Sequence, residues 1–439
     1  MNRKSDTPKN EETSVLREEY TELFSEEEEA VDFSWDQEER LDLVYPKEKE
    51  EEPEEFTAVT TGRGKAILTV FLLVIALFAL VAVMTRGFGL WIKRSYTLRE
   101  EGVFKTSVSR LVGTVGGTVL SGDTEGLSAY DSDGNLVYNV SYHMAEPLLD
   151  TCGSYAVVYD SGRNLANVVS EEGFLYRVQP LYPIVRACVQ NDGSLLVIGQ
   201  KDLESEILVF SPSGKEMLRR VTKSATDGQP MAAALSDDGN LLVTAYTRFS
   251  GTKLEGIITF FDLSTVGGIY SDRLLANFTY DDTLFTDCWF SDGKLVAFGD
   301  NRIVTFDAGT APAEVSSRQL THQIRQMVHT GEGYAVLYGT ETMHSEESLV
   351  NQLVFYNTAG EETFRTETEN IVLLQAFGSR FIWGDGYMYY AVNRDGSQVW
   401  KLQSTESIRQ FYPLSEKRLL AVTADSMQWR QVVEVEENS

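Results

Sequence analysis

The first candidates for a metal-binding site in this sequence are five short polar clusters that contain Asp-Gly. They are DSDGN at 131–135, QNDGS at 190–194, SDDGN at 236–240, FSDGK at 290–294 and NRDGS at 393–397. A calcium loop of the EF-hand type needs oxygen ligands at positions one, three and five, glycine at six and glutamate at twelve. In the first cluster Gly134 follows Asp133 directly, no glutamate stands at the required distance, and SDDGN departs from the pattern in the same way. We therefore interpret the clusters as hairpin turns, in which Asp238 and Gly239 supply the backbone conformation that a tight turn needs.

The cysteines and histidines do not form a recognisable catalytic or metal-binding pattern. Cys188 and Cys288 each stand four residues before a turn aspartate, where the unit beginning at Met231 has Ala234. This equivalence predicts packed free thiols in two different repeat units rather than a disulfide. The remaining candidates, which show no C-x-x-C, H-x-H or H-E-x-x-H spacing, are Cys152, His143, His322, His329 and His344. We therefore expect no catalytic residue, no cofactor and no metal site.

The first 62 residues differ in charge from the rest of the chain. Residues 1–60 contain 21 acidic and 7 basic side chains, which gives half of the net charge of −28. So large an excess of carboxylates argues against nucleic acid as a partner, because phosphate binding relies on clustered Lys and Arg. Apolar residues such as Leu16, Tyr20 and Trp35 are interleaved with the acids. The segment is predicted to be a disordered tail over 1–62, with a short docking helix for a cytosolic partner as the alternative.

A single apolar run over 66–84, AILTVFLLVIALFALVAVM, predicts a transmembrane helix. Its 19 residues, of which only Thr69 is polar, are long enough to cross a hydrocarbon core of about 30 Å. The run lies too far from the chain start and is too long for a secretory signal peptide, so we expect it to remain as an anchor, with an interfacial extension to residue 92. Lys and Arg flank both ends, so the positive-inside rule does not decide the orientation. An uncleaved signal anchor favours a cytoplasmic N-terminus and an extracytoplasmic C-terminal domain.

The region 104–436 consists of short alternating apolar runs that are separated by turns. Each repeat unit contains two hairpins, one with an Asp-Gly-like turn, such as MAAALSDDGNLLVTAY from Met231, and one such as SEILVFSPSGKEMLRRV from Ser205. Eight first hairpins can be counted, at spacings of roughly 36 to 54 residues, which bracket the period of a four-stranded propeller blade. The final second hairpin, SMQWRQVVEVE, is degenerate. The sequence predicts an all-β fold, a β-propeller of eight blades, with seven as the alternative if a terminal unit is incomplete.

The second hairpins resemble a known propeller repeat. VNRDGSQVWKL at 392–402, FSPSGKEMLRR at 210–220 and YDSDGNLVYNV at 130–140 are similar to the pyrroloquinoline-quinone-like repeat, a WD-type propeller pattern. The chain from about residue 60 onwards resembles the single-pass, membrane-anchored propeller proteins of Gram-positive bacteria, a family without an assigned function. Quinone-dependent dehydrogenases of this fold would imply a Cys-Cys pair, which is absent from the sequence. The resemblance implies an architecture and does not imply an activity.

Three kinds of function are compatible with this architecture. We expect a non-catalytic scaffold at the cell membrane that binds a protein or an envelope component outside the cytoplasm. The alternatives are a sensor that signals through the acidic tail and an envelope enzyme of the dehydrogenase or hydrolase type. No individual binding residue can be assigned, but three irregular segments are predicted to be binding loops. They are SATDGQP at 224–230, YTRFSGTKLEG at 246–256 and TETMHSEES at 340–348.

Overall fold

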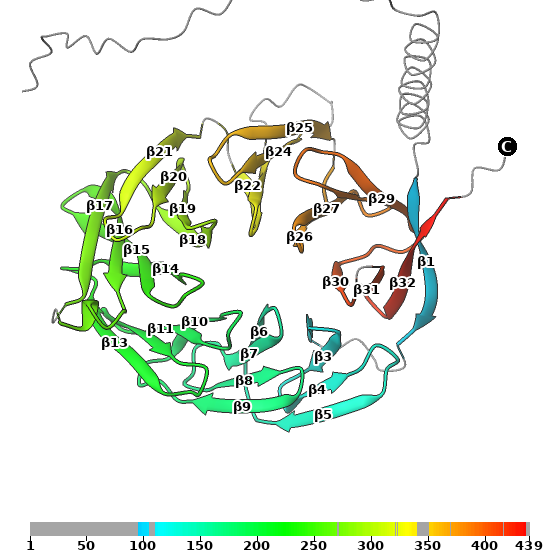
Figure 1. The fold of residues 1–439 in the computed structure, drawn as a ribbon, viewed down its shortest axis with the longest axis horizontal. Helices are drawn as coiled ribbons and strands as arrows, with labels where there is room; N and C mark the ends of the chain where they lie inside the picture. Colours follow the sequence, from blue (N-terminus) through cyan, green and yellow to red (C-terminus); the bar gives the residue numbers. More distant parts are fainter. Residues whose placement is uncertain are drawn as a thin grey trace, which may run out of the picture. The chain divides into compact units, whose positions relative to one another are not determined.

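The structure, a computed structural model, describes residues 95–104, 110–269, 272–320, 322, 324–339, 351–368, 370–415 and 417–435. Within these residues the chain forms eight four-stranded antiparallel sheets, arranged as the blades of a ring (Figure 1). The predicted tail over 1–62 and the predicted transmembrane helix over 66–84 lie outside the described residues. Among the residues that are described, no helix is long and apolar enough to cross a membrane.

The blades follow one another in chain order, and seven of them are built from four consecutive strands. Blades 1 to 3 are β2 (Leu111–Val115), β3 (Thr118–Gly122), β4 (Gly126–Tyr130), β5 (Leu136–Ser141); β6 (Pro147–Cys152), β7 (Tyr155–Asp160), β8 (Ala166–Ser170), β9 (Gly173–Val178); and β10 (Ile184–Val189), β11 (Leu195–Lys201), β12 (Glu204–Phe210), β13 (Glu216–Lys223). Blades 4 and 5 are β14 (Gln229–Leu235), β15 (Leu241–Ser250), β16 (Lys253–Asp262), β17 (Leu274–Asp281); and β18 (Phe285–Ser291), β19 (Lys294–Gly299), β20 (Arg302–Asp307), β21 (Ala313–Gln319). Blades 6 and 7 are β22 (Ile324–Thr330), β23 (Gly333–Tyr338), β24 (Asn351–Asn357), β25 (Glu362–Thr368); and β26 (Leu373–Phe377), β27 (Arg380–Gly384), β28 (Met388–Val392), β29 (Gln398–Gln403). A 3-10 helix, η1 (Gly267–Ile269), lies between β16 and β17.

The eighth blade combines both ends of the described chain. Its three inner strands are β30 (Gln410–Pro413), β31 (Arg418–Val422) and β32 (Met427–Glu434), and its outermost strand is β1 (Tyr96–Val103). Strand β1 pairs antiparallel with β32, with Leu98 opposite Val432 (Figure 1). The propeller therefore begins at Tyr96 and not at residue 104. The last repeat looks degenerate in the sequence because its fourth strand comes from the opposite end of the domain.

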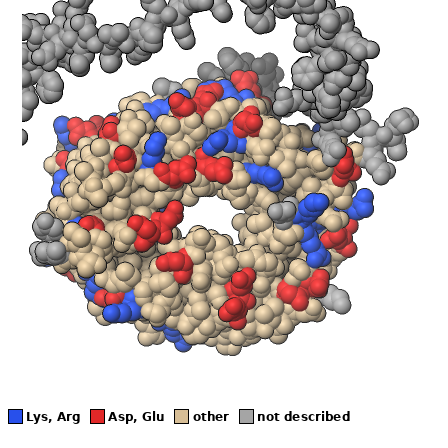
Figure 2. Space-filling model, viewed as in Figure 1, with Lys and Arg blue, Asp and Glu red and all other residues tan. Residues whose placement is uncertain are grey.

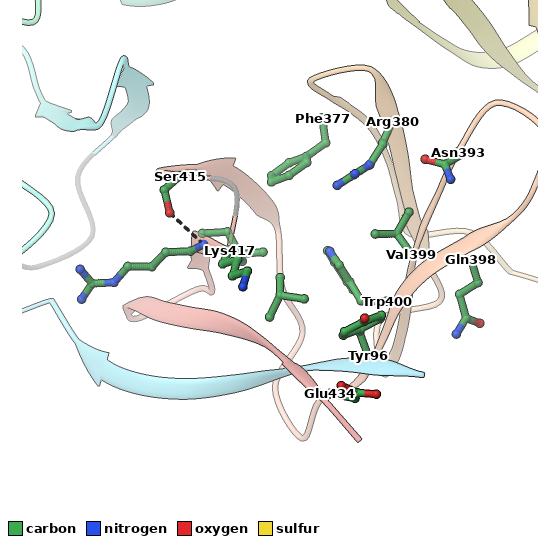
Figure 3. A pocket seen from close by; sticks show the side chains of 13 residues that line it. Tyr96, Phe377, Arg380, Asn393, Gln398, Val399, Trp400, Ser415, Lys417 and Glu434 are labelled. Atoms are coloured by element: carbon green, nitrogen blue, oxygen red, sulfur yellow. Dashed lines mark hydrogen bonds between the residues drawn. The ribbon is translucent and has the colours of Figure 1, made fainter. Parts of the chain in front are cut away.

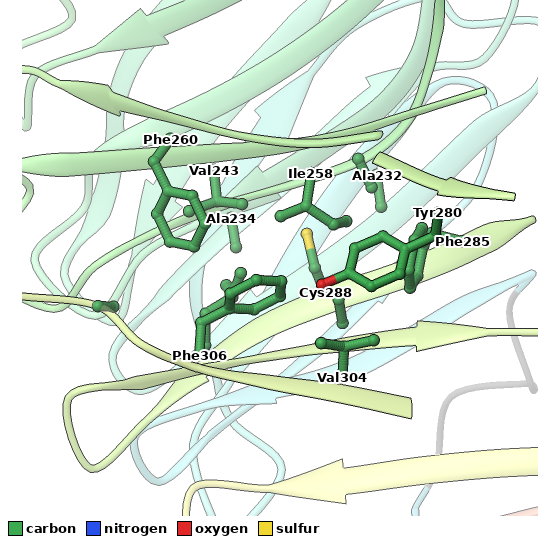
Figure 4. Close-up of a cluster of buried hydrophobic side chains, with 14 residues drawn as sticks. Ala232, Ala234, Val243, Ile258, Phe260, Tyr280, Phe285, Cys288, Val304 and Phe306 are labelled. Atoms are coloured by element: carbon green, nitrogen blue, oxygen red, sulfur yellow. The ribbon is translucent and has the colours of Figure 1, made fainter. Parts of the chain in front are cut away.

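The hydrophobic core is divided among the blade interfaces. The described residues form eight buried apolar clusters, and each cluster joins two neighbouring blades, including blade 8 with blade 1. The middle strands are covered on both faces and are almost continuously buried, as in β8 and β12, whereas in the outer strand β13 most positions are exposed and alternate with partly buried ones. Between blades 4 and 5, Phe260 and Phe306 pack at a ring separation of 5.4 Å, near Cys288 (Figure 4). Radial stacking of this kind buries sheet faces that a single blade would expose to water.

The Asp-Gly clusters are hairpin turns, as predicted, and their carboxylates bind the backbone of the turn itself. Gly239 has φ of 68°, and Asp238 Oδ1 accepts a hydrogen bond from the Asn240 amide at 3.0 Å. Hydrogen bonds from Ser236 and Asn240 hold the pKa of Asp238 below its usual value. Asp131 and Asp395 are bound in the same manner. Backbone geometry therefore accounts for the acidic residues, and the described residues contain no group of three or more His, Cys, Asp or Glu positioned to hold a metal ion.

Two turn glycines are predicted to differ in their cost of substitution. Gly239→Ala should lower the free energy of unfolding by about 1–2 kcal/mol, because an alanine at positive φ is strained while a Cβ there would have no neighbour within 4 Å. Gly396→Ala should cost more, because its Cβ would stand 2.1 Å from the Phe364 ring. Urea unfolding followed by tryptophan fluorescence measures both values. Equal losses would show that the Phe364 ring moves aside freely.

The order of strands fixes two distinct faces of the ring. In each four-stranded meander, the connection between strands one and two and the connection between strands three and four lie at the same end of the sheet. We call this end, which carries the Asp-Gly clusters, the turn face. The opposite end, the connection face, carries the connections between strands two and three and those between successive blades. On the face shown in Figure 2, acidic side chains gather around the central opening, and such an opening repels polyanions.

Candidate functional site

Two of the three predicted binding loops belong to the connection face, and these two are in contact. Residues 224–230 join blade 3 to blade 4, and residues 246–256 form the end of the β15–β16 hairpin. The second segment is mostly paired strand and not irregular, since only Gly251 and Thr252 separate two ten-residue strands. Arg248 Nη1 donates to the Thr226 carbonyl at 2.8 Å and so links the two segments. The third segment, 340–348, lies outside the described residues.

Three large apolar side chains project from this part of the connection face. Leu181 follows β9, Leu203 lies in the β11–β12 turn and Phe249 stands near the end of β15, and each side chain is 72% exposed. Single exposed apolar residues are common, but three of them on adjacent connections suggest a binding surface. We call these three residues, with the connections that carry them, the blade 3–4 patch.

Hydrogen bonds hold the connections of the patch together. Tyr182, next to Leu181, donates its hydroxyl to Glu204 at 2.7 Å and its amide to the buried Glu206 at 2.7 Å. The Ser224 amide donates to the Leu203 carbonyl at 2.9 Å. Arg248 is held by Glu255 through bonds of 2.8 and 3.0 Å. The apolar side chains are thus presented by a rigid surface, which lowers the entropy lost on binding.

The rim of the patch is polar and carries both signs of charge. Lys201, Asp202, Lys223 and Lys253 are exposed around it, while the Arg248–Glu255 pair is internally neutral. An apolar centre within a polar rim is the usual anatomy of a protein–protein interface. Leu181 and Leu203 were not singled out from the sequence, because each lies in a short connection whose position beside the β15–β16 hairpin depends on the fold. The only sequence signal was the presence of large apolar residues next to turn residues.

A cavity of about 320 Å³ lies among the inner strands of blades 2 to 6. Its lining includes all three cysteines of the chain, although only the equivalence of Cys188 and Cys288 was evident from the sequence. Cys152 joins them because it ends β6, at the same level of the ring. Arg186 of blade 3 reaches past the alanines of β14 and pairs with Asp287 of blade 5 at 3.0 Å. Small residues in β14 therefore leave space for an ion pair between two blades that are not neighbours.

The thiols of this cavity are not activated for chemistry. All three cysteines are free. Burial, followed by the charge of Asp150, raises the pKa of the Cys188 thiol to about 11. Burial likewise raises the pKa of Cys152 and of Cys288. Because a nucleophilic or metal-binding cysteine requires the thiolate, the geometry favours packed thiols, in agreement with the prediction for Cys188 and Cys288.

His329, which also lines the cavity, should make the stability of the propeller depend on pH. Its ring stacks on Trp289 at 4.3 Å, and burial, together with the charge of Arg186 and against that of Asp287, lowers its pKa below 6.5. The unfolded chain then binds more protons than the folded chain, so this contribution is present above pH 6.5 and is lost as the pH falls through the lowered pKa. A difference of one unit between the pKa of His329 in the folded and in the unfolded chain corresponds to about 1.4 kcal/mol in the free energy of unfolding.

We expect His329→Gln to reduce the change in unfolding midpoint between pH 7.5 and pH 5.5. His143→Gln is the matched control, because the His143 ring is exposed. The contribution of Asp150 to stability has the opposite pH dependence. Burial raises the pKa of its carboxyl above 3.8, so this contribution is present at acidic pH and is lost as the pH rises through the raised pKa. Urea unfolding at each pH measures these effects. An unchanged pH dependence in His329→Gln would contradict the assignment to this ring.

Comparison with known proteins gives a family for this fold. A family model, described as a family of unknown function (DUF5711), matches residues 93–430. The chain belongs to this family. The match begins just before β1 and ends within β32, so the family model includes strands of all eight blades and omits the acidic tail. No curated protein matches the sequence.

The chain is also similar to solved structures. They include the Pan2 WD40 domain of Neurospora crassa, at 10% identity and a TM-score of 0.42, covering 65% of this chain and 88% of that domain. Sqt1 of Saccharomyces cerevisiae matches at 12% identity and a TM-score of 0.49, covering 78% and 99%. BBS1N, whose structure is in complex with ARL6DN, matches at 12% identity and a TM-score of 0.39, covering 76% and 97%. At these identities the matches concern the fold and carry no argument about function.

Proposed function

We propose that this chain is a membrane-anchored, non-catalytic scaffold that binds a protein partner through the blade 3–4 patch. The observation that carries the proposal is the group of three apolar side chains, Leu181, Leu203 and Phe249, exposed on a hydrogen-bonded surface. Propellers bind partners through the connections at their two faces, since the blades themselves are occupied by packing against each other. The buried, protonated thiols of the cavity favour a binding protein over an enzyme.

The proposed anchor is the helix predicted over 66–84, with the tail in the cytoplasm and the propeller outside. Strand β1 begins at the turn face, because it runs antiparallel to β32, which ends there. An anchor attached to Tyr96 would therefore approach the ring from the turn face. The apolar patch lies on the opposite, connection face, which is the proposed binding surface for a partner in the envelope.

Photocrosslinking in cells tests the binding surface. A photoreactive amino acid placed at Phe249 or Leu203 should give one defined crosslinked protein. Val266, which is also exposed but lies between β16 and β17 on the turn face, is the matched control position and should not. The variant Leu203→Ser/Phe249→Ser should lose the partner while keeping the melting temperature of the parent. Equal crosslinking from Val266, or unchanged partner recovery by the double variant, would contradict the proposal.

Protease treatment of intact cells tests the topology separately. We expect the propeller to be cleaved and an epitope within residues 1–60 to be protected. Cleavage of the tail with survival of the propeller would reverse the proposed orientation. Release of the full-length chain from membranes by carbonate would contradict the anchor itself.

A further inference from the structure

A groove lies between blades 7 and 8, on the turn face. It has a volume of about 630 Å³ and is bounded by the β26–β27 turn, the β30–β31 turn and the start of β1. Trp400 and Leu419, both 1% exposed, belong to its apolar base. Arg380 lies on the blade 7 side and Lys417 on the blade 8 side (Figure 3). The groove therefore combines an apolar base with cationic side chains on both walls.

The charge of this groove is opposite to that of the chain as a whole. Among the described residues, its lining contains Arg380, Lys417 and Arg418 and one acidic residue, Glu434, in a chain of net charge −28. Arg418 is neutralised by Glu101 at 2.8 Å and lies 3.6 Å from Asp133. Arg380 and Lys417 form no ion pair with any described residue. Two uncompensated cations are thus available to a ligand.

We propose that the blade 7–8 groove binds the phosphate of an anionic phospholipid headgroup, with the apolar base receiving the glycerol and the start of an acyl chain. An arginine offers a phosphate a fork of two donors, and a lysine adds a mobile point charge. A purely polar anion would gain no binding free energy from the apolar base to which Trp400 belongs.

The position of the groove in the chain favours a lipid over other anions. Tyr96, which lines the groove, begins β1, and only residues 85–95 separate it from the predicted transmembrane helix. A stretch of this length spans at most roughly 40 Å, even when fully extended. This step depends on the proposed membrane anchor. With that anchor, the segment before Tyr96 would keep the start of β1 within roughly 40 Å of the membrane.

The rest of the turn face limits the interaction to a single site. The Asp-Gly clusters place Asp131, Asp238 and Asp395 on this face, and hydrogen bonds lower the pKa of each carboxyl. These carboxylates are ionised at neutral pH and repel an anionic bilayer. The turn face as a whole is therefore not a membrane-binding surface, and attraction is confined to the groove.

Binding of short-chain lipids to the full-length protein in uncharged detergent tests the inference. We expect dioctanoyl phosphatidylglycerol to bind saturably and dioctanoyl phosphatidylcholine to bind at least ten-fold more weakly, as measured by microscale thermophoresis. Arg380→Gln/Lys417→Gln should weaken phosphatidylglycerol binding at least ten-fold. Lys201→Gln/Lys253→Gln removes the same charge from the connection face and should leave binding unchanged. Melting temperatures establish that both double variants are folded.

Several results would overturn the inference. Equal affinity of the parent and Arg380→Gln/Lys417→Gln for phosphatidylglycerol would place lipid binding elsewhere. Equal affinity for phosphatidylcholine would contradict the role of charge, and equally tight binding of inorganic phosphate would indicate a free-anion site. Binding of an acidic peptide such as residues 13–46, in the absence of any lipid binding, would indicate a peptide site. Lipid binding by a chain that carbonate releases from membranes would refute the anchor alone, whereas a carbonate-resistant chain without lipid binding would refute the groove alone.

Discussion

Leu98→Asp should destabilise the propeller more than any exposed substitution, with a loss of about 3 kcal/mol or more in the free energy of unfolding. Leu98 is 5% exposed and belongs to the cluster that joins blades 7 and 8. An aspartate there would be buried among apolar side chains without a partner, which is one of the few mechanisms of severe destabilisation. If the carboxylate instead forces β1 away, the edge of β32 becomes free to pair with another chain. The expected readouts are a lower urea midpoint and a concentration-dependent increase in size by light scattering.

Arg99→Asp is the matched control for this substitution. Arg99 follows Leu98 in β1, pairs with Gln431 and is exposed, because successive side chains of a strand point to opposite faces. We expect its free energy of unfolding to differ from that of the parent by no more than about 0.5 kcal/mol. A Leu98→Asp protein with the midpoint and size of Arg99→Asp would show that β1 does not close the ring.

The eight-bladed fold could be predicted from the sequence because each blade repeats two local signals. Glycine at positive φ, as at Gly239, marks a turn, and the buried middle strands appear as apolar runs. These signals depend on neighbouring residues alone. The pairing of β1 with β32 joins residues more than 300 positions apart, and no local signal specifies it. For this reason the eighth blade appeared incomplete, and the strand over Tyr96–Val103 was not assigned.

The candidate sites were less predictable than the fold, because each one is assembled from several blades. The β15–β16 hairpin could be selected from its unusual length, with two ten-residue strands, but Leu181 and Leu203 become part of the same surface only through bonds such as that from Ser224 to the Leu203 carbonyl. Similarly, Arg380 begins β27 and Lys417 lies in the β30–β31 turn, and both line one groove because blades 7 and 8 pack together. The spacing of single residues in the sequence does not contain this information. The transmembrane helix over 66–84 is the reverse case, a strong local signal that lies outside the described residues and stays a prediction.

Phe306→Ala should show how far the stability of the ring depends on one blade interface. Phe306 is fully buried between blades 4 and 5, with ring centroids 5.4 Å from Phe260 and 4.9 Å from Phe278 (Figure 4). Loss of a buried aromatic ring costs the transfer free energy of the removed atoms and leaves a cavity, for a total of about 3–5 kcal/mol. Because each apolar cluster joins only two neighbouring blades, the damage should begin locally, and hydrogen exchange should increase first in β14 to β21.

Two further variants separate the loss of the ring from less specific effects. Phe306→Leu keeps much of the side-chain volume, and we expect it to retain most of the stability of the parent. Val315→Ala removes an exposed apolar side chain from the outer strand of the same blade and should have little effect. If exchange in Phe306→Ala increases equally in all eight blades, the ring unfolds as one cooperative unit, and closure by β1 is then what couples the blades. If it increases only in blades 4 and 5, the interfaces act separately, and the patch on blades 3 and 4 would lose its rigid support while the distant blades remain folded.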